Sequence, residues 1–99
     1  MITTKTMNVN GNILQGISIS SPGGEGHPNM LVIVGTKGYI MCGYLNQEAA
    51  KSFGDVACVI SGKELEDLLD APVKAVLPEA EKLGIQIGMT GAQVCEIIA

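Results

Sequence analysis

The chain has 99 residues, which allows one hydrophobic core, and 16% of them are charged where an ordinary soluble domain has about 25%. The net charge is −4 and the six basic residues are scattered lysines, which excludes a broad nucleic-acid surface built on clustered lysine and arginine. So few solvating groups favour self-association, and a small, weakly charged monomer is the alternative.

A β-hairpin is predicted at the start of the chain. Asn10-Gly11 suits a type I′ turn because both residues tolerate positive φ, and it would join strands at residues 4–9 and 12–20. Side chains of the second strand alternate between its two faces. One of these faces, which we predict as a subunit interface, carries Ile13, Gln15, Ile17 and Ile19.

Two central strands are predicted next. Residues 21–28 are rich in glycine and proline and are predicted to form a loop. Residues 30–34 are apolar on both sides, as in a doubly covered strand, and residues 39–43 would return beside them. Gly38 is expected to take the left-handed position of the bulged turn that joins these two strands.

The second half is predicted to alternate between helix and extended chain. Asn46 can cap a short helix that runs through Phe53, and residues 56–60 follow as a buried strand. Ser61 and Glu64 have the spacing of a capping box, in which the glutamate side chain reaches back to the start of the next helix. A turn or short extended piece is expected after that helix.

Two further helices are predicted near the C-terminus. Pro78 would open one that ends before Gly84, because proline is favoured in a first helical turn and glycine just past a last one. Thr90 and Gln93 form a second capping box, which would open the final helix.

The predicted fold is therefore α+β, in a single domain that spans residues 1–99. An antiparallel or mixed sheet would come mainly from residues 1–43. Three to four short helices, with one strand near residues 56–60, would come from residues 44–99.

Charge is distributed unevenly between these two parts. Among the first 43 residues only Lys5, Glu25 and Lys37 are charged, so the strand-rich part has few solvating side chains. We therefore predict that the N-terminal sheet is the subunit interface and that the acidic helices face water.

Cys42 is the main candidate for chemistry, because it lies at a strand end before a helix, where nearby amides can lower the pKa of a thiol. A nucleophilic cysteine also needs a base, and the one imidazole, His27, lies beside Glu25 in the glycine-rich loop. That histidine is expected to be a solvated loop residue. Cys42 would otherwise be a small buried hydrophobic side chain. Tyr39 and Tyr44 flank it as candidate ligand contacts.

Thr90 and Gly91 are further candidates, because amides at a helix N-terminus can hold an anion. In the alternative interpretation the glycines of this segment serve the end of one helix at Gly84 and a tight entry to the next at Gly88. The cysteines Cys42, Cys58 and Cys95 lack the paired spacing of zinc ligands, so no metal site and no cofactor are predicted.

The cellular location is predicted from the cysteines and from the chain start. Three widely spaced cysteines suit a reduced cytoplasmic protein better than a disulfide scaffold. The start lacks a continuous apolar segment, and the longest strongly apolar run is too short to span a bilayer, so no membrane association is predicted.

Three segments are distinctive as a set: residues 37–46 (KGYIMCGYLN), 66–71 (EDLLDA) and 80–91 (AEKLGIQIGMTG). In this order and spacing they resemble the YunC-like family of small bacterial and archaeal proteins, a domain family of unknown function. The resemblance implies an α+β domain whose N-terminal β region mediates tetramerisation, and it implies no established reaction. The loop around His27 departs from the shorter connection of that family.

Two functional hypotheses follow. The first is a cytoplasmic homo-oligomer, tetrameric by the resemblance, that binds an unidentified small molecule or acts as a scaffold. The alternative is a small enzyme with a Cys42-centred pocket between the Tyr39–Tyr44 strand end and a neighbouring subunit. Neither hypothesis involves nucleic acid or a membrane.

Overall fold

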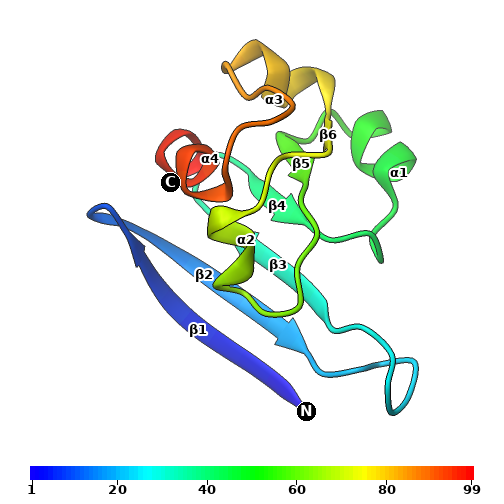
Figure 1. Cartoon of the computed structure of the whole chain (residues 1–99). Coiled ribbons are helices and arrows are strands. Elements are labelled where there is room, and N and C mark those ends of the chain that lie inside the picture. Colours follow the sequence, from blue (N-terminus) through cyan, green and yellow to red (C-terminus); the bar gives the residue numbers. More distant parts are fainter.

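The computed structural model describes all of residues 1–99 and confirms an α+β fold, with a six-stranded mixed sheet and four short helices (Figure 1). The strands are β1 (Ile2–Val9), β2 (Asn12–Ile19), β3 (Met30–Val34), β4 (Tyr39–Met41), β5 (Ala57–Val59) and β6 (Ala75–Val76). The helices are α1 (Gln47–Ser52), α2 (Asp67–Asp70), α3 (Pro78–Lys82) and α4 (Gly91–Ile98).

The strands follow one another across the sheet in chain order, from β1 at one edge to β6 at the other. All neighbouring pairs are antiparallel except β4 and β5, which are parallel. A parallel pair needs a crossover connection, and α1 supplies it here. The chain therefore changes from a meander of hairpins to one β–α–β unit at β4.

Local signals in the sequence correctly predicted most element boundaries. Asn10 (φ 54°) and Gly11 (φ 88°) form the hairpin turn between β1 and β2. The Asn46 side chain accepts the hydrogen bond of an amide in the first turn of α1. Pro78 opens α3, and both hydrogen bonds of the Thr90 capping box are present at the start of α4.

The left-handed conformation predicted for Gly38 is wrong, because this residue does not have a positive φ. A Cβ atom at this position would lie 2.4 Å from the carbonyl oxygen of Val56. The neighbouring Tyr39 N–H donates to that same carbonyl at 3.0 Å. Glycine therefore allows the close approach of two backbones at this point, rather than a left-handed turn.

The capping box predicted at Ser61 is also wrong, because the helix in this region begins only at Asp67. In a helix opened by Ser61, the Lys63 carbonyl would accept a hydrogen bond from the Asp67 amide. That carbonyl instead accepts from the Asn29 side chain at 2.8 Å, and the Asp67 amide donates to Glu64 in a tighter turn. The Glu64 side chain makes no capping hydrogen bond. Its backbone N–H instead donates to the Asp67 carboxylate at 3.0 Å.

The second half also contains one more strand than predicted. The expected strand near residues 56–60 is β5, and β6 pairs antiparallel with it at the sheet edge. The segment that forms β6 was predicted only as a turn or extended piece, because two residues are too short for an alternating pattern.

The two faces of the sheet are covered differently. The main core lies on one face, where Leu68 of α2 and Val94 and Ile98 of α4 belong to the same buried cluster as Leu31 and Ile40 of the sheet. On the other face, a smaller cluster lies over β4 and β5 and contains Met41, Ala50, Ala57, Val59 and Leu77. The long β1–β2 hairpin lies at the edge of the sheet (Figure 1).

The second face is not covered over β1, β2 and β3. By strand register, the side chains on this part of the sheet, here called the outer β1–β3 face, are Ile2, Thr4, Thr6, Asn8, Ile13, Gln15, Ile17, Ile19, Met30, Val32 and Val34. Several of its apolar side chains are exposed, including Ile2 at 69% and Ile13 at 55%. The four residues predicted as an interface all belong to this face.

Candidate functional site

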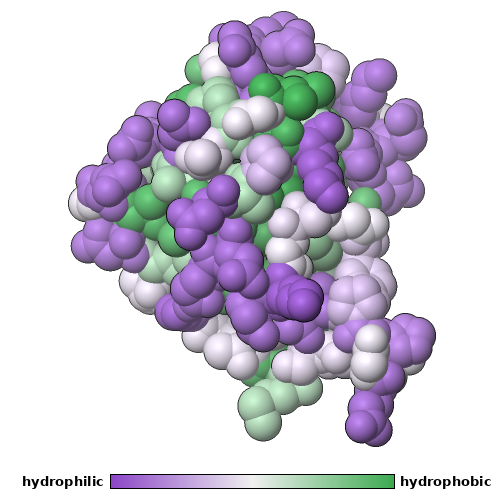
Figure 2. Space-filling view, in the orientation of Figure 1, coloured by the Kyte–Doolittle hydropathy of each residue, from purple (hydrophilic) through white to green (hydrophobic).

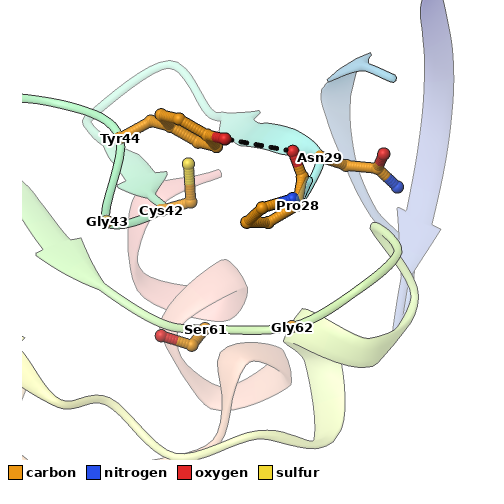
Figure 3. A pocket seen from close by; sticks show the side chains of 7 residues that line it. All are labelled: Pro28, Asn29, Cys42, Gly43, Tyr44, Ser61 and Gly62. Atoms are coloured by element: carbon orange, nitrogen blue, oxygen red, sulfur yellow. Dashed lines mark hydrogen bonds between the residues drawn. The ribbon is translucent and has the colours of Figure 1, made fainter. Parts of the chain in front are cut away.

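A pocket of about 410 Å³ lies where the chain leaves the carboxyl ends of β4 and β5. In open α/β sheets, the carboxyl ends of parallel strands are the usual place for ligands. Figure 3 shows the segment after β4 on one side and the segment after β5 opposite, with the end of the glycine-rich loop between them. The residues that line this Cys42 pocket are Pro28, Asn29, Cys42, Gly43, Tyr44, Ser61 and Gly62.

The pocket opens because the two parallel strands part. Their last shared hydrogen bond runs from the Ile60 N–H to the Met41 carbonyl at 3.1 Å. The next bond of a regular ladder would join Gly43 to Ile60, and it is not formed. Cys42 remains attached to the other neighbour, since its N–H donates to the Leu31 carbonyl at 3.2 Å. The sheet therefore holds one wall of the pocket in place.

The Cys42 thiol is held at this wall. Its residue is 6% exposed, and its Sγ accepts a hydrogen bond from the Leu31 N–H at 3.3 Å. Figure 3 shows the sulfur beside the Tyr44 ring. His27, the one imidazole in the chain, does not line this pocket.

Hydrogen bonds from side chains hold the loop that forms the third wall. The Tyr44 hydroxyl donates to the Pro28 carbonyl at 3.3 Å (Figure 3). Asn29 donates through Nδ2 to the Lys63 carbonyl at 2.8 Å and accepts through Oδ1 from the Ser21 N–H at 3.0 Å. The asparagine thus ties the loop after β2 to the segment after β5, so the pocket walls are positioned by the fold.

A second hollow, of about 440 Å³, adjoins the first. It shares Pro28, Asn29 and Gly62 with the Cys42 pocket and adds Gly26, His27, Lys63 and Glu64. The side chains of Lys63 and Glu64 form no hydrogen bond and no ion pair within the protein. We call this region the charged hollow, because Lys63 and Glu64 line it, whereas the lining of the Cys42 pocket contains no charged residue.

Tyr39 lies away from the pocket, although the sequence placed it among the candidate ligand contacts. Its hydroxyl donates to the Asp55 carboxylate at 2.5 Å, and its ring packs beside the cluster under α1. Burial, followed by the hydrogen bond and the negative charge of Asp55, raises the pKa of Tyr39 to about 12. Its contacts are those of a structural residue.

Thr90 and Gly91 also lie outside both hollows. Thr90 caps α4 through the hydrogen bonds of its capping box. Gly91 lies against α2, where an added Cβ would be 1.8 Å from the Leu68 carbonyl oxygen. The contacts of both residues are those of a helix start.

Of the residues predicted as ligand contacts, the structure places Cys42 and Tyr44 together in the lining of this pocket. Two polar lining residues, Asn29 and Ser61, were not among the predicted contacts. The sequence did contain a signal for Ser61. A strand, a short helix and a second strand in succession predict a parallel pair, and Ser61 follows the second strand, so it lies near Cys42 at the adjacent carboxyl ends. Asn29 had no local signal, since its partners lie far away in the sequence.

The remaining cysteines pack in the interior. Cys58 and Cys95 are fully buried in the main core. Burial raises the pKa of Cys58 to about 12, with a smaller contribution from Cys95, and burial raises the pKa of Cys95 to about 11. Both are protonated and shielded thiols at neutral pH.

No helix has the length and apolar character required to cross a bilayer. Nor does any group of three histidine, cysteine, aspartate or glutamate side chains come close enough together to hold a metal ion.

Comparison with known proteins places the chain among relatives of unknown function. The profile of a domain of unknown function, DUF1805, matches residues 41–98. The uncharacterized protein YunC of Bacillus subtilis (strain 168) is 40% identical over an alignment 70 residues long, which covers 66% of this chain and 69% of YunC. The crystal structure of TA1206, a protein of unknown function from Thermoplasma acidophilum, is 33% identical with a TM-score of 0.88, over 100% of this chain and 94% of that one. The chain therefore belongs to the DUF1805 family and is similar to YunC.

Proposed function

We propose that this protein is a homo-oligomeric domain that binds a small molecule in the Cys42 pocket and assembles through the outer β1–β3 face. The observation that carries the proposal for assembly is an uncovered sheet face with no charged side chain. Exposed apolar surface of this kind is typical of interaction sites.

A second copy of the chain is the occupant that the charges favour. Lys5 pairs with Glu66 beside α2, so its side chain lies on the opposite side of the sheet. Glu25 and Lys37 lie in loops. Two outer faces can therefore meet without like charges in contact, which an interface between identical surfaces requires. On the helix-bearing side, hydrophilic residues cover much of the surface (Figure 2).

The free edge of β1 supports assembly independently. This strand has 8 residues, contains no proline and pairs with β2 in an unbroken register. Proteins usually protect so long an edge, because its unpaired backbone groups can bind another strand. A face and an edge offer two different self-contacts, and a tetramer with dihedral symmetry is built from such contacts. A tetramer is therefore the assembly we propose.

Light scattering tests the assembly. The wild-type particle should have about four times the chain mass of 10.3 kDa. Thr4→Glu places a charge on the outer β1–β3 face and should shift the particle toward the monomer, since an unpaired charge is costly to bury. Thr3→Glu is the matched control, because Thr3 points to the opposite face of the same strand. A monomeric wild type, or equal behaviour of the two variants, would contradict the proposal.

The position and shape of the Cys42 pocket support ligand binding. Its volume lies within the range of about 300–1,000 Å³ that is usual for small-molecule sites, and hydrogen bonds from Tyr44 and Asn29 hold its walls. Three free and buried cysteines favour the reducing cytoplasm as the location.

A Cys42-dependent enzyme is the second candidate function, and the thiol at the pocket wall favours it. Such an enzyme needs a reactive thiolate, so Cys42 should be alkylated by iodoacetamide near neutral pH faster than free glutathione. The buried Cys58 and Cys95 serve as unreactive internal controls. A rate for Cys42 at or below that of glutathione would leave binding without catalysis as the function of the pocket.

A further inference from the structure

The Cys42 pocket and the charged hollow adjoin each other, and we refer to the two together as the groove, with one hollow at each end. Three residues line both of them, namely Pro28, Asn29 and Gly62. The segment after β5 runs along the groove and contributes Ser61 at the first end and Lys63 at the second. A small molecule could therefore contact both ends at once.

The charges of this groove are confined to one end and have opposite signs. Lys63 and Glu64 are adjacent in the chain, line the same hollow and are both exposed. Neither side chain is paired within the protein, and the capping role predicted for Glu64 is not realised. A ligand with a single charge would be attracted by one of these groups and repelled by the other. A ligand that carries both charges side by side can pair with both.

We infer that the groove binds a small zwitterion of the α-amino-acid type. Its carboxylate would lie toward Lys63, its ammonium group toward Glu64, and its uncharged side chain in the Cys42 pocket. This inference rests on the proposed ligand-binding function and specifies the class of ligand.

Gly43 is a position at which a variant can obstruct the first end of the groove. Its φ is not positive, so the backbone conformation does not require glycine. A Cβ at this position would meet no atom within 4 Å, so packing does not require glycine either. Because Gly43 lines the Cys42 pocket, we expect a larger side chain at position 43 to narrow it, and we use Gly43→Val as the variant that obstructs the groove without a clash in the core.

Three probes that share a hydroxymethyl group test the inference by backbone-amide chemical shifts at neutral pH. L-Serine carries both charges, 3-hydroxypropanoate lacks the ammonium group, and ethanolamine lacks the carboxylate. All three should shift the amides of Gly43, Ser61 and Gly62, with L-serine binding most tightly. Because pairs of exposed charges are weak, each missing charge should lower the affinity by about two- to fivefold.

Two surface variants should change this order in opposite ways. Glu64→Gln removes the partner of the ammonium group, so L-serine should lose its advantage over 3-hydroxypropanoate. Lys63→Gln removes the partner of the carboxylate, so L-serine should lose its advantage over ethanolamine. Gly43→Val should abolish the shifts with every probe, while the rest of its spectrum remains that of the folded protein.

The outcomes separate this inference from the proposed function. If all three probes bind at these amides with equal affinity, or if neither charge variant changes the order, the pocket binds small molecules but the zwitterion assignment is wrong. If no probe shifts these amides even at high concentration, the zwitterion assignment is again wrong. Screening the same amides with uncharged probes then decides whether the pocket binds small molecules at all.

Discussion

Gly91→Ala tests whether Gly91 is needed for packing between helices rather than for a ligand. An added Cβ would lie 1.8 Å from the carbonyl oxygen of Leu68, and a Cβ is essentially never found closer than 3.0 Å to a heavy atom of a residue that is not its neighbour in the chain. The obstacle is backbone, so it cannot rotate away as a side chain could. Helices α2 and α4 would have to separate by about 1.2 Å, the difference between these two distances.

The cost of this separation follows from the contacts it disturbs. Overpacking in a close-packed interior typically costs about 1–3 kcal/mol. The Gly91 N–H also donates to the Ala71 carbonyl at 3.1 Å, and Leu68 and Val94 are fully buried in the core beside it. We therefore expect the free energy of unfolding to fall by about 3 kcal/mol, at the upper end of that range.

Urea denaturation at one fixed protein concentration measures this loss, because assembly would otherwise change the apparent stability. With a slope of roughly 1–3 kcal/mol per molar urea, the midpoint should fall by about 1–3 M. Gly43→Ala is the matched control, since its Cβ meets nothing within 4 Å, and its midpoint should be unchanged. A midpoint for Gly91→Ala equal to that of Gly43→Ala would refute the packing argument.

Three further predictions concern a helix cap and two kinds of titrating group. Thr90→Ala removes the side-chain acceptor at the start of α4 and should lower the free energy of unfolding by about 1 kcal/mol, measured by thermal melting. Since the pKa of Tyr39 is raised to about 12 from an ordinary 10.0, the folded state keeps a proton that the unfolded state loses. Stability should therefore fall as the pH rises from 10 toward 12; Tyr39→Phe should remove this part of the fall, and Asp55→Asn should lower the pKa seen by ultraviolet titration. Cys58 and Cys95 should resist alkylation in native protein and react only after unfolding, as mass spectrometry would show; rapid native modification would contradict their burial.

Features decided by a few adjacent residues could be predicted from the sequence. The Asn10-Gly11 turn and the caps at Asn46 and Thr90 depend on groups within four residues of each other. The roles of Gly38 and Ser61 could not be predicted in this way. Gly38 is required by the close approach of the Val56 backbone, and the capping box at Ser61 is prevented by the hydrogen bond from Asn29 to the Lys63 carbonyl. Val56 and Asn29 both come from other segments of the chain.

The candidate site shows the same division. Cys42 and Tyr44 could be placed together because they are two residues apart at the end of one strand. Asn29 and Ser61 joined them only because the sheet sets β3, β4 and β5 side by side, with β4 and β5 parallel. The groove toward Lys63 likewise depends on a hydrogen bond across 34 positions of sequence.

The sequence by itself determined the fold class, the family and a strand-rich N-terminal part with few charges, because composition, motifs and local spacing are sufficient for these. Only the tertiary structure decided which face of that sheet is uncovered and where the pocket opens. Helices α2 and α4 bury one face of the sheet, and α1 covers the other only over β4 and β5. The uncovered face and the parting of β4 from β5 both follow from the packing of distant segments, for which a local sequence pattern contains no signal.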